Sequence, residues 1–389
     1  MSYEKADKAS LRRNRNIRLG VLVLILLLIT GIGLLHQFGG SFRPAGVDAL
    51  CPFGGIEAAY TLVASGVLLQ KVAVSALILL AATIIVALIF RRAFCGQICP
   101  LGTLQELTGM LGAKITGKKY IVPTAVDKPA RYLKYVVLLL IVVFTAITSE
   151  LIYRPYDPWV AWQHLSSADI FSEFMIGFIV LIITLVGSMF VGRLFCRYLC
   201  PMGAFLALLF PVGRFGVKRN QSTCIKCKIC NRECPMGIDI MGSEKVTSVE
   251  CINCSTCVNA CPVKDTLTIS DRRGKSISPI ALLVSVLLIF TVVVGVTTYT
   301  GDFSWGTQSL QTSVEKTGQF NPEEIKGFMT LKDVADASGI PKEAFQEEFK
   351  VADSDFTVPI KELVPKYGFK TEAIRAFSEE YITKNGSGK

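Results

Sequence analysis

Five long apolar runs alternate with polar segments along this chain of 389 residues. The runs cover residues 19–35, 72–90, 133–149, 174–191 and 280–298. Each run is close to the roughly 20 residues that a helix needs to cross a hydrocarbon core of about 30 Å. The pattern therefore predicts a mainly α-helical integral membrane protein with about five transmembrane helices.

The first and third runs each leave a question open. Residues 1–18 are polar and basic, so a cleaved signal peptide is the alternative to a first membrane helix at 19–35. The run is long for the apolar part of a signal peptide, which favours a retained helix. In the third run Lys134 lies near the start, where its side chain is expected to extend to the membrane surface.

Lysine and arginine are unevenly distributed among the polar segments. Segments 1–18, 91–134 and 192–279 contain 6, 8 and 13 of them, whereas segments 36–71 and 149–173 contain 2 and 1. The positive-inside rule then predicts a multi-pass protein of the inner (cytoplasmic) membrane, with its N-terminus in the cytoplasm and residues 299–389 outside. This topology explains the net charge of +10, so membrane lipid is the expected partner and nucleic acid is not.

The second and fourth runs are followed by one motif. Residues 92–100 read Arg-Ala-Phe-Cys-Gly-Gln-Ile-Cys-Pro, and residues 193–201 read Arg-Leu-Phe-Cys-Arg-Tyr-Leu-Cys-Pro. An outer loop with an apolar, re-entrant stretch is expected before each run, at 56–69 and 160–171. The membrane domain, residues 19–213, is therefore predicted to contain two parallel two-helix units with C-x3-C-P ends.

Eight of the 13 cysteines lie in two runs of the form C-x2-C-x2-C-x3-C-P, which begin at residues 224 and 251. This is the spacing of bacterial ferredoxins, in which the fourth cysteine of each run binds the other cluster. Zinc sites and disulfides are the alternatives, and neither requires this regularity. We predict a cytoplasmic ferredoxin domain at 214–278, followed by the last membrane helix at 279–298. Its two [4Fe-4S] clusters would be bound by Cys224, Cys227, Cys230 and Cys261, and by Cys251, Cys254, Cys257 and Cys234.

The C-x3-C-P motifs contribute four further cysteines, namely Cys95, Cys99, Cys196 and Cys200. A C-x3-C spacing at a helix end places two thiols one turn apart on one face, and the proline is expected to end the helix. Two such pairs on repeat-related helices would supply four thiolates to one site. We predict a third iron–sulfur centre there, [2Fe-2S] or [4Fe-4S], at the inner leaflet. Two dithiol pairs without metal are the alternative.

Several residues at the predicted outer ends of the helices have two interpretations each. Cys51, in Cys-Pro-Phe-Gly-Gly, is either a small buried residue at a turn or a ligand or redox-active thiol. His36 and His164 are either interfacial histidines or groups that accept quinol protons or bind one b haem. A nearby polar and aromatic cluster fits either an aromatic belt or a quinone headgroup site, and consists of Tyr153, Tyr156, Asp157 and Trp159.

The C-terminal segment 299–389 is acidic, with 11 basic and 14 acidic residues in 303–389, and contains a repeat with an offset of 29 residues. Each unit predicts a helix, a tight turn at Gly339 or Gly368, and a second helix. The first unit is superficially similar to a DNA-reading helix-turn-helix. Because the segment is acidic and poor in arginine, a small helical interaction domain is the favoured interpretation.

The combination of two membrane C-x3-C-P motifs with two ferredoxin motifs resembles the NapH/NosR/CcoG group of membrane polyferredoxins, over residues 15–298. The resemblance implies electron transfer as a subunit of a redox complex, with a flavin- or haem-bearing partner and quinone. NapH-like members are quinol dehydrogenase subunits, and CcoG-like members serve metalloenzyme assembly. This chain lacks the flavin domain of NosR-like members, and its helical tail departs from NapH-like ones. Three functions stay open: quinol-linked electron transfer, electron donation in assembly, and redox-sensing regulation.

Overall fold

The computed structural model describes most of the chain. α-Helices dominate the described part, and its three strands form one antiparallel sheet. The chain divides into two compact units, residues 1–305 and 306–389, which are treated separately below. The described residues are 4–38, 44, 51–65, 70–117, 120, 122–148, 153–167, 169–306, 310, 314, 320–322, 325, 327 and 329–385.

Each of the five apolar runs forms a helix. These helices are α1 (Lys8–Phe38), α3 (Gln70–Phe90), α7 (Leu133–Thr148), α10 (Met175–Phe190) and α15 (Pro279–Tyr299). Among the described residues, α1 and α15 are long and apolar enough to cross a membrane, whereas α10 and the Val74–Phe90 part of α3 are apolar but shorter. Helices α1, α10 and α15 expose aliphatic side chains such as Leu27, Ile183 and Val292, which is unusual for surfaces that face water.

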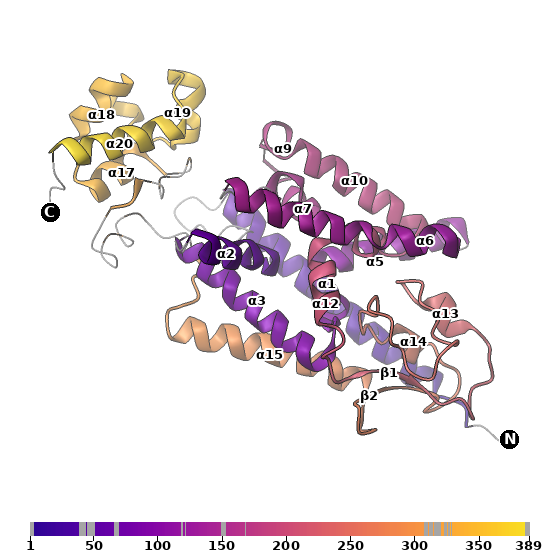
Figure 1. The fold of residues 1–389 in the computed structure, drawn as a ribbon. Coiled ribbons are helices and arrows are strands. Elements are labelled where there is room, and N and C mark those ends of the chain that lie inside the picture. Colours follow the sequence, from indigo (N-terminus) through magenta and orange to yellow (C-terminus); the bar gives the residue numbers. More distant parts are fainter. Residues whose placement is uncertain are drawn as a thin grey trace. The chain divides into compact units, whose positions relative to one another are not determined.

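Short helices pack against the long ones in both repeat units. Helix α2 (Pro52–Ser65) packs on α3, and α15 lies along α3 as well (Figure 1). In the second unit, η2 (Arg154–Tyr156) and α8 (Pro158–Gln163) pack on α10, as does the short α9 (Asp169–Ser172). The predicted re-entrant stretches therefore form helices that fold back on the next long helix, although residues 66–69 and 168 lie outside the described residues.

The C-x3-C-P motifs connect two helices in each unit. Helix α3 is followed by α4 (Ala93–Gln97) and α5 (Pro100–Thr116), and α10 is followed by α11 (Leu194–Tyr198) and α12 (Pro201–Leu209). The prediction that the prolines end a helix is wrong, because Pro100 and Pro201 begin α5 and α12. A proline suits the first helical position, where its missing N–H leaves no hydrogen bond unmade. Helix α6 (Thr124–Ala130) lies between α5 and α7.

The ferredoxin region contains the sheet and two short helices. Strands β1 (Gly216–Arg219), β2 (Leu267–Ser270) and β3 (Ser276–Ile277) pair antiparallel in that order, and α13 (Ile229–Glu233) and α14 (Thr256–Asn259) carry cysteines. Val217 and Ile269 belong to the same buried cluster as Val86 and Phe90 of α3. The ferredoxin region and the helical region therefore share one hydrophobic core.

The N-terminal segment is attached to the ferredoxin region (Figure 1). The Ala6 N–H donates to the Pro262 carbonyl over 2.9 Å, and the Lys264 N–H donates to the Glu4 carbonyl over 3.0 Å. These bonds join the start of α1 to the residues that directly follow Cys261. The residues that precede α1 therefore pack against the ferredoxin region.

The C-terminal unit has the predicted order of helix, glycine turn and helix, twice. Its elements are α17 (Leu331–Ser338), α18 (Lys342–Phe349), η4 (Asp353–Asp355), α19 (Ile360–Tyr367) and α20 (Thr371–Asn385). Gly339 and Gly368 end α17 and α19 with φ of 72° and 76°, a conformation that favours glycine. Phe345 is fully buried in the small core of this unit.

Candidate metal centres

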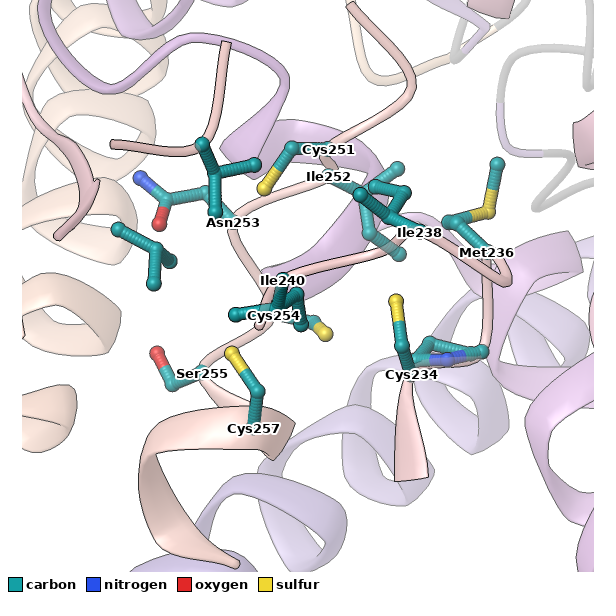
Figure 2. Close-up of a pocket in the computed structure, with 13 residues that line it drawn as sticks. Cys234, Met236, Ile238, Ile240, Cys251, Ile252, Asn253, Cys254, Ser255 and Cys257 are labelled. Atoms are coloured by element: carbon teal, nitrogen blue, oxygen red, sulfur yellow. The ribbon is translucent and has the colours of Figure 1, made fainter. Parts of the chain in front are cut away.

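Four cysteines, one after α13 and three from residues 251–257, surround one cavity (Figure 2). They are Cys234, which follows α13, Cys251 and Cys254 in the next loop, and Cys257 in α14. We call this cavity the proximal pocket, because it lies beside α4 and α11. Its other walls are apolar and include Met236, Ile238, Ile240 and Val246. The structure thus brings together the four residues predicted for the second cluster.

The four cysteines predicted for the first cluster also line one cavity, which we call the distal pocket. They are Cys224, Cys227, Cys230 and Cys261. Cys227 is exposed and Cys224 is half-buried, whereas Cys251, Cys254 and Cys257 of the proximal pocket are all buried. The two pockets therefore have the same ligand pattern in different surroundings.

The thiols suit iron–sulfur clusters. None of the 13 cysteines, all of which are described, forms a disulfide. In the described part of the chain no three His, Cys, Asp or Glu side chains converge closely enough to bind a single metal ion. The cysteines of each pocket instead surround a space, as cluster ligands do when each sulfur binds a different iron. Burial raises the pKa of Cys251 to about 12, so that thiol needs a metal to displace its proton at neutral pH.

The two C-x3-C-P turns also bring their cysteines together. Cys95 lies in α4 and Cys99 caps α5, while Cys196 lies in α11 and Cys200 caps α12. Each of the four thiols interacts electrostatically with at least one thiol of the other pair. Because α5 and α12 begin at these prolines, free backbone N–H groups face the sulfurs, and the Gly203 N–H donates to Cys200 Sγ over 3.3 Å. A helix N-terminus stabilises a thiolate.

Two buried arginines, Arg92 and Arg193, each contact the C-x3-C-P motif of the other repeat. The Arg193 Nη1 group donates to the Cys95 carbonyl over 2.6 Å. A Cβ on Gly102 would lie 2.7 Å from Arg193 Nη1, and a Cβ on Gly203 would lie 2.9 Å from Arg92 Nη2. The glycine in each motif therefore leaves space for the arginine of the other repeat. No role was predicted for these arginines from the sequence. Their equivalent positions, just after the second and fourth apolar runs, could have indicated a shared structural role.

Glu106 of α5 balances part of this positive charge. Its carboxylate accepts hydrogen bonds from Arg18 of α1 over 2.8 Å and from Arg193 over 2.6 Å. Burial alone would raise the pKa of Glu106, but the two arginines lower it to about 2. Arg18 also donates to the Gly96 carbonyl over 2.8 Å, so α1 is bound to the first C-x3-C-P turn.

Lys134 does not extend to the membrane surface as predicted. It is fully buried, and its Nζ lies 2.5 Å from both carboxylate oxygens of Glu250. Arg92 Nη1 lies 3.3 Å from the same carboxylate. The prediction failed because a buried carboxylate from a distant segment is a better partner for the ammonium group than a route to solvent. Glu250, which directly precedes Cys251, was another residue that sequence reasoning missed.

The proximal pocket touches both C-x3-C-P turns. A Cβ on Gly96, between Cys95 and Cys99, would lie 2.3 Å from the Ile252 carbonyl oxygen. The Gln97 amide donates to the Asn253 carbonyl over 3.0 Å. At the other turn, a Cβ on Gly237 would lie 2.6 Å from Arg197 Nη2. The backbone of the proximal pocket is therefore in close contact with both turns.

Several of the remaining candidate residues pack near the C-x3-C-P cysteines, namely Cys51, Tyr153 and Trp159. Cys51 is half-buried and packs against the cluster of buried residues that contains Cys95. It interacts electrostatically with Tyr153, whose ring packs edge-on against Phe53 at 4.9 Å. Asp157 caps α8 by accepting from the Trp159 N–H over 2.8 Å, while Tyr156 is exposed.

Each of the two histidines has a hydrogen-bonding partner of its own. His36 Nδ1 lies 2.8 Å from the Pro44 carbonyl oxygen, and His164 Nδ1 lies 3.1 Å from Gln37 Nε2. His164 is buried and stacks on Phe174 at 4.3 Å between ring centroids.

Together the cysteine pockets, their buried thiols and their apolar walls define an iron–sulfur electron-transfer protein, and comparisons with known proteins agree. Residues 72–119 and 174–220 each match the family described as a 4Fe-4S binding domain, and residues 216–263 match the 4Fe-4S dicluster domain. The chain belongs to the family of NapH/NosR-type polyferredoxins, as the motifs predicted.

The relatives extend over different shares of the chain. YccM of Escherichia coli, which is named as an electron transport protein, is 32% identical over 67% of this chain and 75% of its own length. MJ0750 of Methanocaldococcus jannaschii is 37% identical over 52% of this chain and 78% of its own length. NapH of Escherichia coli, a ferredoxin-type protein, is 28% identical over 44% of this chain and 56% of its own. No solved structure matches the chain.

Proposed function

We propose that this chain is a membrane-bound electron-transfer subunit that connects a redox partner at the cytoplasmic face with a quinone or a redox partner at the outer face. The bound clusters would supply reversible one-electron storage. The protein supplies their ligands, their spacing and their electrostatic surroundings. Flavin- or haem-bearing subunits are the kind of outer partner that suits this role, and the acidic C-terminal unit is a candidate for docking them.

The observation that carries this proposal is the contact between the proximal pocket and the C-x3-C-P turns. A carrier that spans a bilayer needs an intermediate site between its two faces. Gly96 has no side chain, and this allows the backbone of the first turn to approach Ile252 and Cys254. The two sets of cysteines are therefore close neighbours, as consecutive sites in a relay must be.

We further propose that Cys95, Cys99, Cys196 and Cys200 hold a third iron–sulfur centre. The arrangement of the turns supports it, because the Gly203 N–H donates to Cys200 Sγ, and the buried guanidinium groups of Arg92 and Arg193 interact electrostatically with Cys95 and Cys196. Two buried and two half-buried thiols would otherwise have no evident role. The match of each repeat unit to a 4Fe-4S binding family is consistent with this proposal. Cys51 is a weaker candidate, since it packs beside this cluster of residues without belonging to the turns.

The membrane arrangement is part of the same proposal. The apolar surfaces of α1, α10 and α15 support a lipid environment. The basic flanks support a cytoplasmic ferredoxin region and an outer C-terminal unit.

Iron and acid-labile sulfide analysis of anaerobically purified protein tests the proposal. Wild type is expected to contain clearly more than about eight iron atoms, the content of two [4Fe-4S] clusters. Cys95→Ser is expected to fall to about eight while it keeps the ferredoxin signals in EPR spectra. About eight in both proteins would eliminate the third centre, and zinc in place of iron would refute the whole assignment. Reduction of the clusters by added quinol would identify quinone as a partner.

A further inference from the structure

The two cysteine loops of the ferredoxin region have the same backbone conformation. Lys226 and Lys228, in the distal loop (residues 224–228), have φ of 55° and 61°. Asn253 and Ser255, which occupy the same positions in the proximal loop (residues 251–255), have φ of 48° and 62°. Left-handed conformations at two non-glycine residues are uncommon, so their repetition shows that the cysteine spacing imposes one loop shape. The two loops therefore present equivalent surfaces.

The proximal loop uses this surface to dock on the helical region. Ile252 is only 2% exposed, and Asn253 and Ser255 are buried as well. The Asn253 amide donates to the Phe90 carbonyl over 3.1 Å, and Gln97 donates to the Asn253 carbonyl. Residues 248–259 carry one acidic and no basic side chain, and that acid, Glu250, pairs with cations of the helical region. Shape and charge are thus both matched at this contact.

The distal loop presents the same surface to its surroundings, and no such partner for it occurs among the residues that the structure describes. Ile225, the counterpart of Ile252, is 45% exposed, and Lys226, Cys227 and Lys228 are exposed. Residues 221–232 carry three basic and no acidic side chains, the opposite sign to the proximal loop. An exposed apolar residue followed by two exposed lysines, which flank the exposed cysteine Cys227, is a suitable contact for another redox protein.

We propose that the distal loop is a docking surface for an acidic one-electron carrier protein, which receives Ile225 in an apolar recess and pairs carboxylates with Lys226 and Lys228. The proposal rests on the function proposed above and names its cytoplasmic partner by chemistry. The internal precedent is the proximal loop, whose backbone at Ile252 and Cys254 docks against Gly96 of the first C-x3-C-P turn. Electron exchange at the distal loop forms and breaks no covalent bond. The carrier loses one electron and the protein gains it, or the reverse.

Stopped-flow reduction of the full-length protein in nanodiscs of zwitterionic lipid tests this proposal. The donors are a reduced acidic ferredoxin and, for comparison, a photoreduced deazaflavin, which is small and needs no docking surface. The double variant Lys226→Glu/Lys228→Glu is expected to lower the second-order rate constant with ferredoxin by on the order of tenfold or more. It is also expected to remove most of the salt dependence of that rate constant, while the rate with deazaflavin is unchanged.

A matched pair of charge reversals serves as the control. Arg273→Glu/Lys275→Glu changes the net charge equally at the exposed turn between β2 and β3, and is expected to leave the ferredoxin rate close to wild type. An equal loss in both double variants would overturn the proposal, because net charge would then explain the effect. A loss that appears only in discs of anionic lipid would assign the loop to lipid headgroups and would overturn it as well.

Wild-type protein provides a second arm that does not depend on the variants retaining their clusters. Ferredoxin with amidated surface carboxylates is expected to react on the order of tenfold more slowly than untreated ferredoxin. Equal rates would refute the docking surface. Reduction by deazaflavin reports separately on the proposed function, because a protein that deazaflavin cannot reduce has no functional clusters, whatever its surface binds.

Discussion

The proximal and distal pockets have the same cysteine spacing and the same loop conformation, yet they have different environments. The proximal loop is buried against α4 and contacts the first C-x3-C-P turn, whereas the distal loop is exposed. The residues between the cysteines make this difference, since Asn253 and Ser255 replace Lys226 and Lys228. A lysine in the buried position would need a partner for its charge, while asparagine finds backbone partners there. Spacing therefore determines the ligands, and the intervening residues determine the location.

Replacing one predicted ligand in each pocket should give the largest difference in stability between a proximal and a distal variant. Cys254→Ser and Cys227→Ser are each expected to remove about four iron atoms, because each takes away one cluster ligand. Cys254 is buried at the contact with the helical region, so its variant should also lower the thermal midpoint of residues 1–305. Cys227 is exposed, and its variant should unfold close to wild type. Iron analysis and thermal unfolding would check this, and equal midpoints would contradict the comparison.

The charge group beside the proximal pocket should give the next largest effect. Glu250→Gln leaves Lys134 and Arg92 buried without a full counter-charge. Breaking a buried ion pair in this way costs about 3–5 kcal/mol of unfolding free energy. Glu233→Gln, a change of the same type at the end of α13, removes a weak surface ion pair with Arg232 and should cost less than about 1 kcal/mol. Denaturant unfolding of both variants would measure the difference. Similar losses of unfolding free energy would show that Glu250 is not needed to hold the proximal loop against the helical region.

Much of this architecture could be predicted from local patterns. The five apolar runs, the glycine turns at 339 and 368, and the grouping of cysteines in each pocket all follow from spacing along the chain. The burial of Lys134 could not be predicted, because its partner Glu250 is distant in the sequence. The roles of Arg92 and Arg193 were not predicted for the same reason, since only the folded structure shows that Arg193 binds the Cys95 carbonyl. The role of the prolines was predicted wrongly because a proline both ends and begins helices, and the spacing does not distinguish the two.

A single methyl group should test the close contact at the first C-x3-C-P turn. The Cβ of Gly96→Ala would lie 2.3 Å from the Ile252 carbonyl oxygen, so the proximal loop must move. Overpacking of this kind typically costs about 1–3 kcal/mol. Gly20→Ala on α1, whose Cβ would have nothing within 4 Å, is the matched control and should be neutral or slightly stabilising. EPR signals of the reduced protein would show whether the displacement disturbs the proximal pocket selectively. A Gly96→Ala protein as stable as Gly20→Ala would mean that the contact is looser than described.

The smallest expected effect is a loss of unfolding free energy at acid pH through Glu106 of α5. The pKa of Glu106 is about 2 in the folded protein, against a usual value of 4.5, because Arg18 and Arg193 stabilise its carboxylate. A carboxyl group with a lowered pKa stabilises the fold fully above its unfolded pKa, and this contribution is lost as the pH falls towards the folded pKa. Between pH 6 and pH 4 the loss should be about 1 kcal/mol of unfolding free energy. Glu106→Gln should be less stable than wild type at pH 6 and should lack this part of the pH dependence, whereas Glu233→Gln, at the end of α13, should retain it. If Glu106→Gln and wild type lost stability equally between these pH values, the arginines would not hold Glu106 as a charged group.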